Sequence, residues 1–160
     1  MEFNSKKGQI AIEYILFIAI FLLFFQAVIK PAFDFSENVV TDIQSLTQSK
    51  ENIDLLGQNI DSISSSLGSG KRTVFLYLPN TATITDCNNF LKQLNYKISI
   101  SNMAPKPSIS NCDSNTNTCY FAKQLYIGTN NIYCDAIGPG FSGELTIFKS
   151  TNGDLNVSIK

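Results

Sequence analysis

Four cysteines are the residues of this 160-residue chain whose chemistry is easiest to name: Cys87, Cys112, Cys119 and Cys134. In an oxidising compartment, an even number of cysteines in a small domain predicts two disulfides, for which three pairings are open. The spacing favours Cys112–Cys119, which closes a short loop, and this leaves Cys87–Cys134. A zinc site is the alternative, but the sequence has no CxxC spacing and no histidine to serve as ligands.

The rest of the sequence holds no combination of residues that predicts catalysis. Histidine, the commonest general base and metal ligand, is absent. This argues against a Ser-His hydrolase and against an ordinary metalloenzyme. The formal net charge of −1 argues against a protein that grips nucleic acid by neutralising phosphates. We therefore expect no enzymatic activity, no cofactor, no bound metal and no specific nucleic-acid partner.

Two short motifs in the second half of the chain carry weaker signals. Residues 113–117 (DSNTN) repeat the first half of an EF-hand calcium loop. Thr118 then takes the place of the required Gly and Gln124 that of the required Glu, so we expect a polar turn. Asn156 begins the triplet Asn-Val-Ser, an N-glycosylation sequon, although such triplets also arise often by chance.

A long apolar segment near the N-terminus is the strongest structural feature. Residues 10–29 read IAIEYILFIAIFLLFFQAVI, with only Glu13 and Gln26 outside the apolar and aromatic set. As a helix this segment would be about 30 Å long, the thickness of a bilayer's hydrocarbon core. Lys6 and Lys7 precede it, which places the N-terminus in the cytoplasm and the rest of the chain outside. An ordinary signal peptide fits poorly, because this apolar region is too long and no small-x-small cleavage site follows.

The N-terminal edge of the apolar segment carries a more specific pattern. Lys6-Lys7-Gly8-Gln9 is followed, after Ile10-Ala11-Ile12, by Glu13-Tyr14. This resembles the class III signal peptide of archaeal type IV pilins, which has a short basic leader ending in Gly. That family also has Gln at the first mature position and a Glu-Tyr pair just inside the apolar segment. Archaeal flagellins share the leader but usually lack the acidic residue, so Glu13 favours a pilin.

The resemblance implies how the N-terminus is processed and used. A membrane-embedded prepilin peptidase would cut between Gly8 and Gln9, leaving the apolar helix on the mature protein. A carboxylate inside hydrocarbon costs roughly 2.5–3.5 kcal/mol at the centre of a span and less near its end. Assembly could offset the cost for Glu13 by placing it against the free amine of Gln9 on a neighbouring subunit. The simpler alternative is that Glu13 reaches the lipid headgroups.

A helical pattern continues beyond the apolar segment. Apolar residues recur every seven positions, at Val39, Leu46, Ile53, Ile60 and Leu67. Further apolar residues lie between them, at Ile43, Leu56 and Ile63. Gly68-Ser69-Gly70 suits a C-terminal cap and turn. Pro31 lacks an N–H and predicts a helix kink, with a plain break as the alternative. We expect one long, interrupted helix from about Gln9 to Leu67, whose stripe packs on the head, on other subunits, or in a coiled-coil stalk.

The remainder of the chain predicts a small, mainly antiparallel β domain. Five strands are expected, at Thr73–Leu78, Tyr96–Ser101, Thr118–Ile127, Glu144–Lys149 and Leu155–Ile159. A short helix is expected from Thr85-Asp86 to about Leu94. The expected fold is α+β and type IV pilin-like. It comprises a cleaved cytoplasmic leader (1–8), a helix (9–70) that spans the membrane at about 10–29, and an extracellular head (71–160).

Charge divides along the same boundary. Residues 9–70 carry two lysines against seven acidic residues, a net charge of −5, and residues 71–160 carry eight basic against five acidic residues, a net charge of +3. A basic face on the head could help attachment to anionic surfaces, with ordinary solvated charge as the simpler interpretation.

Two functions are consistent with these features. The first is a structural subunit of an archaeal type IV pilus-like extracellular filament, in which the precursor waits in the membrane and then polymerises with itself through its helix. Its other partners would be the prepilin peptidase and the assembly machinery, and its use could be surface adhesion. The second is a single-pass membrane-anchored binding module on a coiled-coil stalk. A minor or initiating pilin lies between the two.

Overall fold

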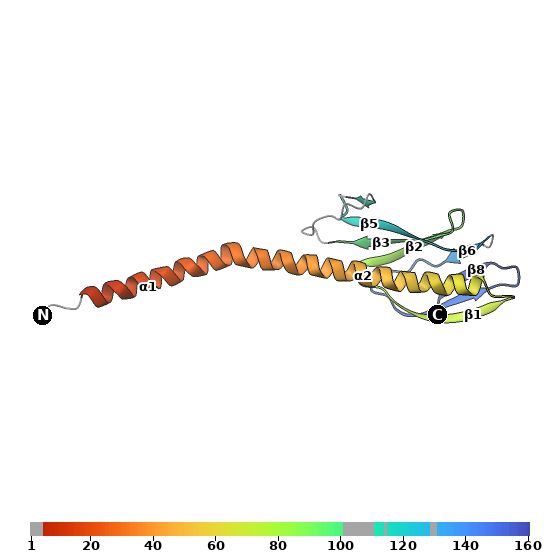
Figure 1. Cartoon of the computed structure of the whole chain (residues 1–160), viewed down its shortest axis with the longest axis horizontal. Coiled ribbons are helices and arrows are strands. Elements are labelled where there is room, and N and C mark those ends of the chain that lie inside the picture. Colours follow the sequence, from red (N-terminus) through yellow and green to blue (C-terminus); the bar gives the residue numbers. More distant parts are fainter. Residues whose placement is uncertain (1–4, 101–110, 114, 129–130) are drawn as a thin grey trace.

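One long helix projects from a β head in this elongated molecule (Figure 1). The computed structural model describes residues 5–100, 111–113, 115–128 and 131–160, with side chains from Ile12 onward. The helix has three parts that follow one another without a break, namely α1 (Ser5–Phe24), the π-helical turn η1 (Phe25–Ile29) and α2 (Lys30–Ser64). The predicted α+β fold with a pilin-like layout is confirmed.

The described part of the head contains two four-stranded sheets. Sheet A has the order β1 (Gly70–Tyr77), β7 (Ser142–Lys149), β8 (Leu155–Ile159) and β6 (Ile132–Cys134). Its pairs are antiparallel except β6 with β8, which is parallel. Sheet B is antiparallel throughout, with the order β2 (Ala82–Asn88), β3 (Gln93–Ser99), β5 (Thr118–Gln124) and β4 (Cys112–Asp113). An isolated bridge between Ile84 and Ile137 joins β2 to the segment after β6.

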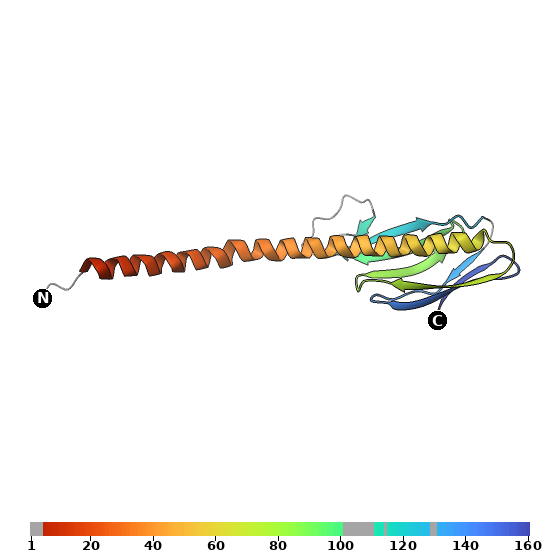
Figure 2. The same ribbon diagram turned by 60° about the horizontal axis from the view of Figure 1, so that its bottom comes forward.

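The second half of α2 lies along both sheets and completes their common core (Figure 2). Ile53, Leu56, Ile60 and Ile63 are buried there, at the spacing of one helix face. They meet alternate residues of both sheets, among them Leu76, Ile84, Leu94, Ile98, Leu145, Ile147 and Leu155. This half of the predicted apolar stripe therefore packs on the head.

All five predicted strands are present, as β1, β3, β5, β7 and β8, although Ser101 lies outside the described residues. The predicted helix from Thr85 to Leu94 is wrong. This segment forms the end of β2, a tight turn and the start of β3. The Asn88 side chain accepts hydrogen bonds from the N–H groups of Phe90 and Leu91, at 3.0 and 2.9 Å, which imitates a helix cap. Lys92 then adopts a positive φ of 52° and ends the turn.

Two further details differ from the sequence prediction. The helix ends at Ser64, so Leu67 lies beyond it and is fully exposed instead of closing the apolar stripe. Strands β2, β4 and β6 were not expected, and β4 and β6 are only two and three residues long. Such short strands exist because a neighbouring strand holds them, and their own sequences carry too few residues to show an alternating pattern.

Candidate assembly surface

The apolar segment projects from the head, and in the part whose side chains the structure describes, residues 12–29, all are exposed except the half-buried Ile29. The large apolar side chains from Ile12 to Phe25 range from 40% exposed at Ile18 to 68% exposed at Phe17. They surround the whole helix, because the sequence places no polar stripe between them. Within the described residues, this is the one helix long and apolar enough to cross a membrane, and none of its most apolar stretch is buried inside the chain.

Covering this segment would release much free energy. Twelve large apolar or aromatic residues are at least 40% exposed between Ile12 and Phe25 (Ile12, Tyr14, Ile15, Leu16, Phe17, Ile18, Ile20, Phe21, Leu22, Leu23, Phe24 and Phe25). Burying the exposed half of each is worth roughly 1 kcal/mol, so the sum is on the order of 10 kcal/mol for each chain. In an isolated chain in water these side chains would stay solvated, and none of this free energy would be gained. We therefore expect lipid or other protein chains to surround the segment.

The residues predicted to act in processing and assembly all lie on α1. Gly8 and Gln9 fall inside its backbone, which begins at Ser5. Glu13 lies four residues after Gln9, hence on the same helix face one turn away, and its side chain is exposed. Tyr14 is 66% exposed on the next face. The structure therefore presents Glu13 and Tyr14 to the surroundings of the helix, while cleavage after Gly8 stays a prediction.

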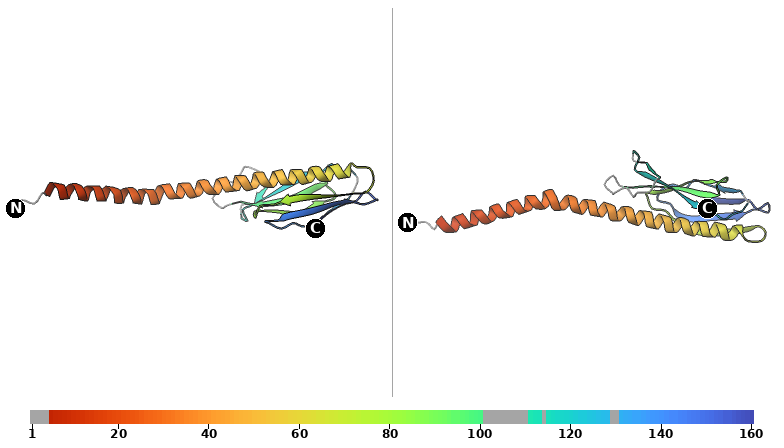
Figure 3. Two further views of the ribbon diagram at one scale, coloured as in Figure 1. Left: turned by 90° about the horizontal axis from the view of Figure 1, so that it is seen from below. Right: turned by 45° about the horizontal axis from the view of Figure 1, so that its top comes forward.

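A bend separates the apolar segment from the polar part of the helix, as Figure 3 shows from two sides. The N–H of Lys30 bonds to the carbonyl of Phe25, five residues back, which widens this turn into the π-helix η1. Pro31 follows in the first turn of α2 and contributes no N–H to the turn before it. The predicted kink at Pro31 is thus a π-turn plus proline inside a continuous helix.

The joint between helix and head depends on residues that the sequence analysis did not single out. Lys149 on β7 is 8% exposed, and its Nζ donates hydrogen bonds of 2.7 Å to the carbonyls of Ser64 and Ser66. These are carbonyls at the C-terminus of α2, where a positive charge is favourable. Asp61 accepts a 2.7 Å hydrogen bond from the backbone N–H of Tyr126. The end of α2 is thereby tied to both sheets.

A further tie lies two turns before Asp61 on α2. Lys123 on β5 forms a 2.7 Å ion pair with Asp54. Its side chain runs over Gly57, where an added Cβ would stand 3.1 and 3.2 Å from two of its carbons. Glycine in a helix interior is unfavourable, so its presence here reflects this close approach. Because no apolar pattern marks it, Gly57 could not be recognised from sequence.

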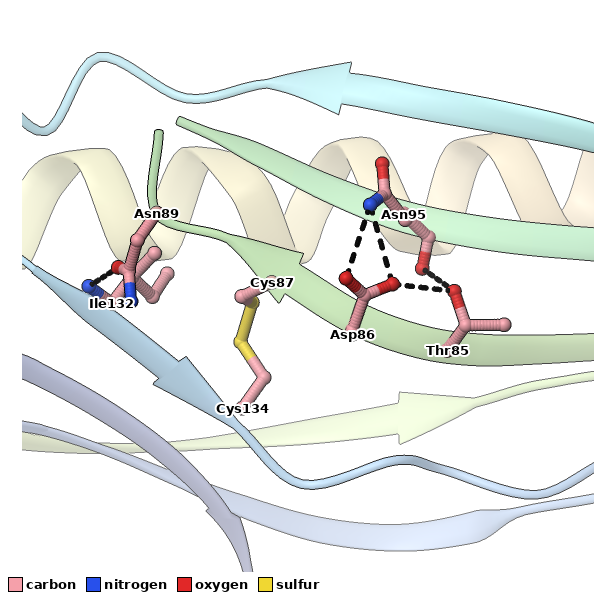
Figure 4. The surroundings of a disulfide bond; sticks show 7 residues. All are labelled: Thr85, Asp86, Cys87, Asn89, Asn95, Ile132 and Cys134. Atoms are coloured by element: carbon pink, nitrogen blue, oxygen red, sulfur yellow. Dashed lines mark hydrogen bonds between the residues drawn. A yellow bond between two sulfur atoms is a disulfide. The ribbon is translucent and has the colours of Figure 1, made fainter. Parts of the chain in front are cut away.

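Both disulfides are formed, in the pairing that the spacing favoured. Cys87 on β2 joins Cys134 on β6 and so links sheet B to sheet A (Figure 4). Beside it, the Asn89 side chain accepts a hydrogen bond from the N–H of Ile132. Cys112 and Cys119 are direct partners on β4 and β5, and their disulfide holds the short strand β4 in place. The sheets are covalently fastened where they meet.

An open groove of about 420 Å³ lies between α2 and sheet B. Leu46, Thr47 and Lys50 form one wall, and the stacked rings of Tyr96 and Phe121, whose centroids are 5.3 Å apart, lie on the other side. Burial, and secondarily the charge of Asp54, raise the pKa of the Tyr96 phenol above its ordinary value of 10.0. The groove offers aromatic surface, the hydroxyl of Thr47 and the ammonium group of Lys50.

The calcium-like loop and the sequon both lie on the surface of the head. Asp113 accepts hydrogen bonds from the N–H of Asn115 and the hydroxyl of Thr116, both 2.9 Å long, as expected for a polar turn. In the described part of the chain, no three His, Cys, Asp or Glu residues are grouped so that they could hold a metal ion. Asn156 is exposed in β8, on the outward face of sheet A.

Comparison with known proteins adds nothing to these observations, because no family, curated protein or solved structure matches the chain. The structure itself defines the class of protein. A long N-terminal helix, apolar and exposed in its first half and packed on the head in its second, is followed by a β head with two disulfides.

Proposed function

We propose that the chain is the structural subunit of an archaeal type IV pilus-like extracellular filament. The observation that carries this proposal is the apolar segment, exposed on all sides and held at a distance from the head. The resemblance of Lys6 to Tyr14 to a class III signal peptide supports it independently of the fold. Adhesion to surfaces is a further expectation, for which the net positive charge of residues 71–160 offers a physical basis.

Two environments in turn would cover the apolar segment. Before assembly the segment spans the membrane, with residues 1–8 in the cytoplasm and the head outside. After the peptidase has cut between Gly8 and Gln9, the machinery draws the helix into a bundle with other copies. Because lipid tails and neighbouring helices are equally apolar, the step requires specific packing and a polar contact to favour the filament.

Glu13 would supply that polar contact. After Glu13 the next charged residue is Lys30, so Glu13 is the only charge among the apolar side chains that follow Gln9. In the filament its carboxylate would pair with the new amine of Gln9 on a neighbouring subunit. A contact between different surfaces of identical subunits propagates without closing, which is the geometry that a filament needs.

The docked half of α2 would transmit this order to the surface. Ile53, Leu56 and Ile60 are at most 1% exposed within the head core, and Lys149 caps the helix end. The head therefore cannot rotate freely about the helix. A regular bundle of helices would display the heads in an equally regular array.

Mass spectrometry of the native N-terminus tests the proposal. Sheared extracellular material should contain a mature chain that begins at Gln9. Gly8→Val should leave the leader attached and the chain in the membrane, because the peptidase must accept the residue before the cut. Ala19→Val introduces the same side chain within the span and should be processed normally.

A membrane-anchored binding module is the second candidate, and the groove between α2 and sheet B is the observation that favours it. In that case a native chain retaining Met1 to Gly8 would stay with the membrane fraction. Such a result would contradict the filament proposal.

A further inference from the structure

The outward face of sheet A carries a row of side chains that the filament role does not use. In the register of the sheet, Asn156 on β8 is the direct partner of Phe148 on β7 and of Tyr133 on β6. Direct partners on neighbouring strands point to the same face. Phe148 is 44% exposed and Tyr133 is 54% exposed, and Asn156 between them is also exposed. The asparagine thus stands between two exposed aromatic rings.

Asn156 is at the same time the first residue of the only Asn-X-Ser/Thr triplet in the sequence, which has 16 asparagines. Val157 points inward and is 2% exposed, so Asn156 and Ser158 both point to the outer face. The amide that would be modified and the hydroxyl that completes the motif therefore share one surface.

We propose that Asn156 carries an N-linked glycan whose first sugars lie over Phe148 and Tyr133. The inference rests on the proposed function, because an exported head is the one that meets a glycan donor. In the transfer, Nδ2 of Asn156 bonds to the anomeric carbon of an oligosaccharide carried on a lipid phosphate. The bond from that carbon to the phosphate oxygen breaks, its electron pair stays on the oxygen, and the proton lost by Nδ2 goes to a base of the transferase.

The position of the two rings gives the glycan a physical role. Neighbouring strands are about 4.8 Å apart, so a sugar rising from the central strand has an aromatic ring within reach on either side. The C–H faces of a sugar and an aromatic ring can pack together and exclude water. A glycan here would cover an apolar patch that is otherwise exposed on the head.

The chain offers a matched control for the modification. Asn152 lies four residues earlier, exposed in the turn between β7 and β8, but Gly153 and Asp154 follow it, so it has no sequon. Cleavage by trypsin after Lys149 releases both asparagines in one peptide, residues 150–160. Fragmentation of that peptide assigns an added mass to one or the other.

The first experiment is mass spectrometry of this peptide from sheared native material, with the N-terminal peptide read in the same sample. We expect a hexose- or hexosamine-containing mass on Asn156 that Asn156→Gln and Ser158→Ala abolish and Asn152→Gln retains. An unmodified Asn156 on chains that begin at Gln9 would overturn the inference and leave the filament proposal intact. A glycan on chains that retain Met1 to Gly8 would support the modification of Asn156 and contradict the filament proposal.

The second experiment tests whether the rings hold the glycan. Ser158→Ala removes the glycan but keeps Asn156, and we expect it to lower the melting temperature of the detergent-solubilised full chain by roughly 2–6 °C. In a background of Phe148→Ser and Tyr133→Ser, which changes exposed side chains only, the same substitution should have less than half this effect. An equal shift in both backgrounds would mean that the rings serve another contact, such as one between heads.

Discussion

Replacing Lys149 by Met should loosen the attachment of the helix to the head while leaving the core packed. Methionine has nearly the same length and keeps the buried stem of the side chain, but it donates nothing to the carbonyls of Ser64 and Ser66. The change removes two hydrogen bonds of 2.7 Å from a charged donor that is 8% exposed. It also removes a positive charge from the C-terminus of α2.

The change in the free energy of unfolding caused by Lys149→Met is the sum of losses and gains. Hydrogen bonds to charged groups contribute about 1.5–3 kcal/mol each, and the charge at the helix end adds about 0.3–1 kcal/mol. Against this, the variant no longer desolvates an ammonium group, and water can reach part of the freed carbonyls. We expect a net loss of about 2 kcal/mol, which lowers the melting temperature by roughly 4–8 °C for a chain of this size.

Thermal unfolding of the full chain in detergent, followed by near-ultraviolet circular dichroism, measures this effect. Lys160→Met is the control, because Lys160 is exposed and its 2.6 Å ion pair with Glu144 is worth only about 0–1 kcal/mol. If Lys149→Met and Lys160→Met shifted the melting temperature equally, the cap would have no special role and the reasoning about the joint would be refuted.

Three other changes should give distinct results. Glu13→Ala should leave the precursor in the membrane while the yield of sheared filament falls at least several-fold. The control Gln26→Ala should change this yield little. An unchanged filament yield from Glu13→Ala would show that this carboxylate has no role in assembly. Replacing Cys87 and Cys134 by Ser should cost about 4 kcal/mol, against about 2.5 kcal/mol for Cys112 and Cys119, because the first disulfide closes the longer loop, 47 residues against 7; denaturant unfolding of both variants checks this order. The raised pKa of Tyr96 means that the folded head holds the phenol proton more tightly than the unfolded chain, so its contribution is complete below pH 10 and is lost as the pH rises further. Tyr96→Phe should therefore flatten the fall in melting temperature between pH 9 and 11, and an unchanged fall would contradict this assignment.

Periodicity explains which parts of the fold could be predicted from sequence. The apolar segment and the strands β1, β3, β5, β7 and β8 each contain enough residues to establish a continuous or alternating apolar pattern. Pro31 marked the bend, because a missing N–H acts locally. The four cysteines indicated the disulfides, and their spacing favoured the pairing that is formed.

Single residues that act across the fold could not be recognised in the same way. Asn88 caps a turn as it would cap a helix, but the chain reverses at Lys92, which has a positive φ, and β2 pairs with β3. Lys149 occupies an inward position of β7 that its charge would normally exclude. The placement of Asn156 between Phe148 and Tyr133 depends on the register of three strands, and one of these, β6, has no pattern of its own.

Electron cryomicroscopy of sheared filaments would decide whether this chain forms their core. We expect a central bundle of helices in which side-chain density fits residues 12–29 of this chain, with the β heads outside it and Glu13 beside the amine of Gln9 on a neighbouring subunit. Filaments whose axis is built from another polypeptide, or whose helices show density for residues 1–8, would contradict it.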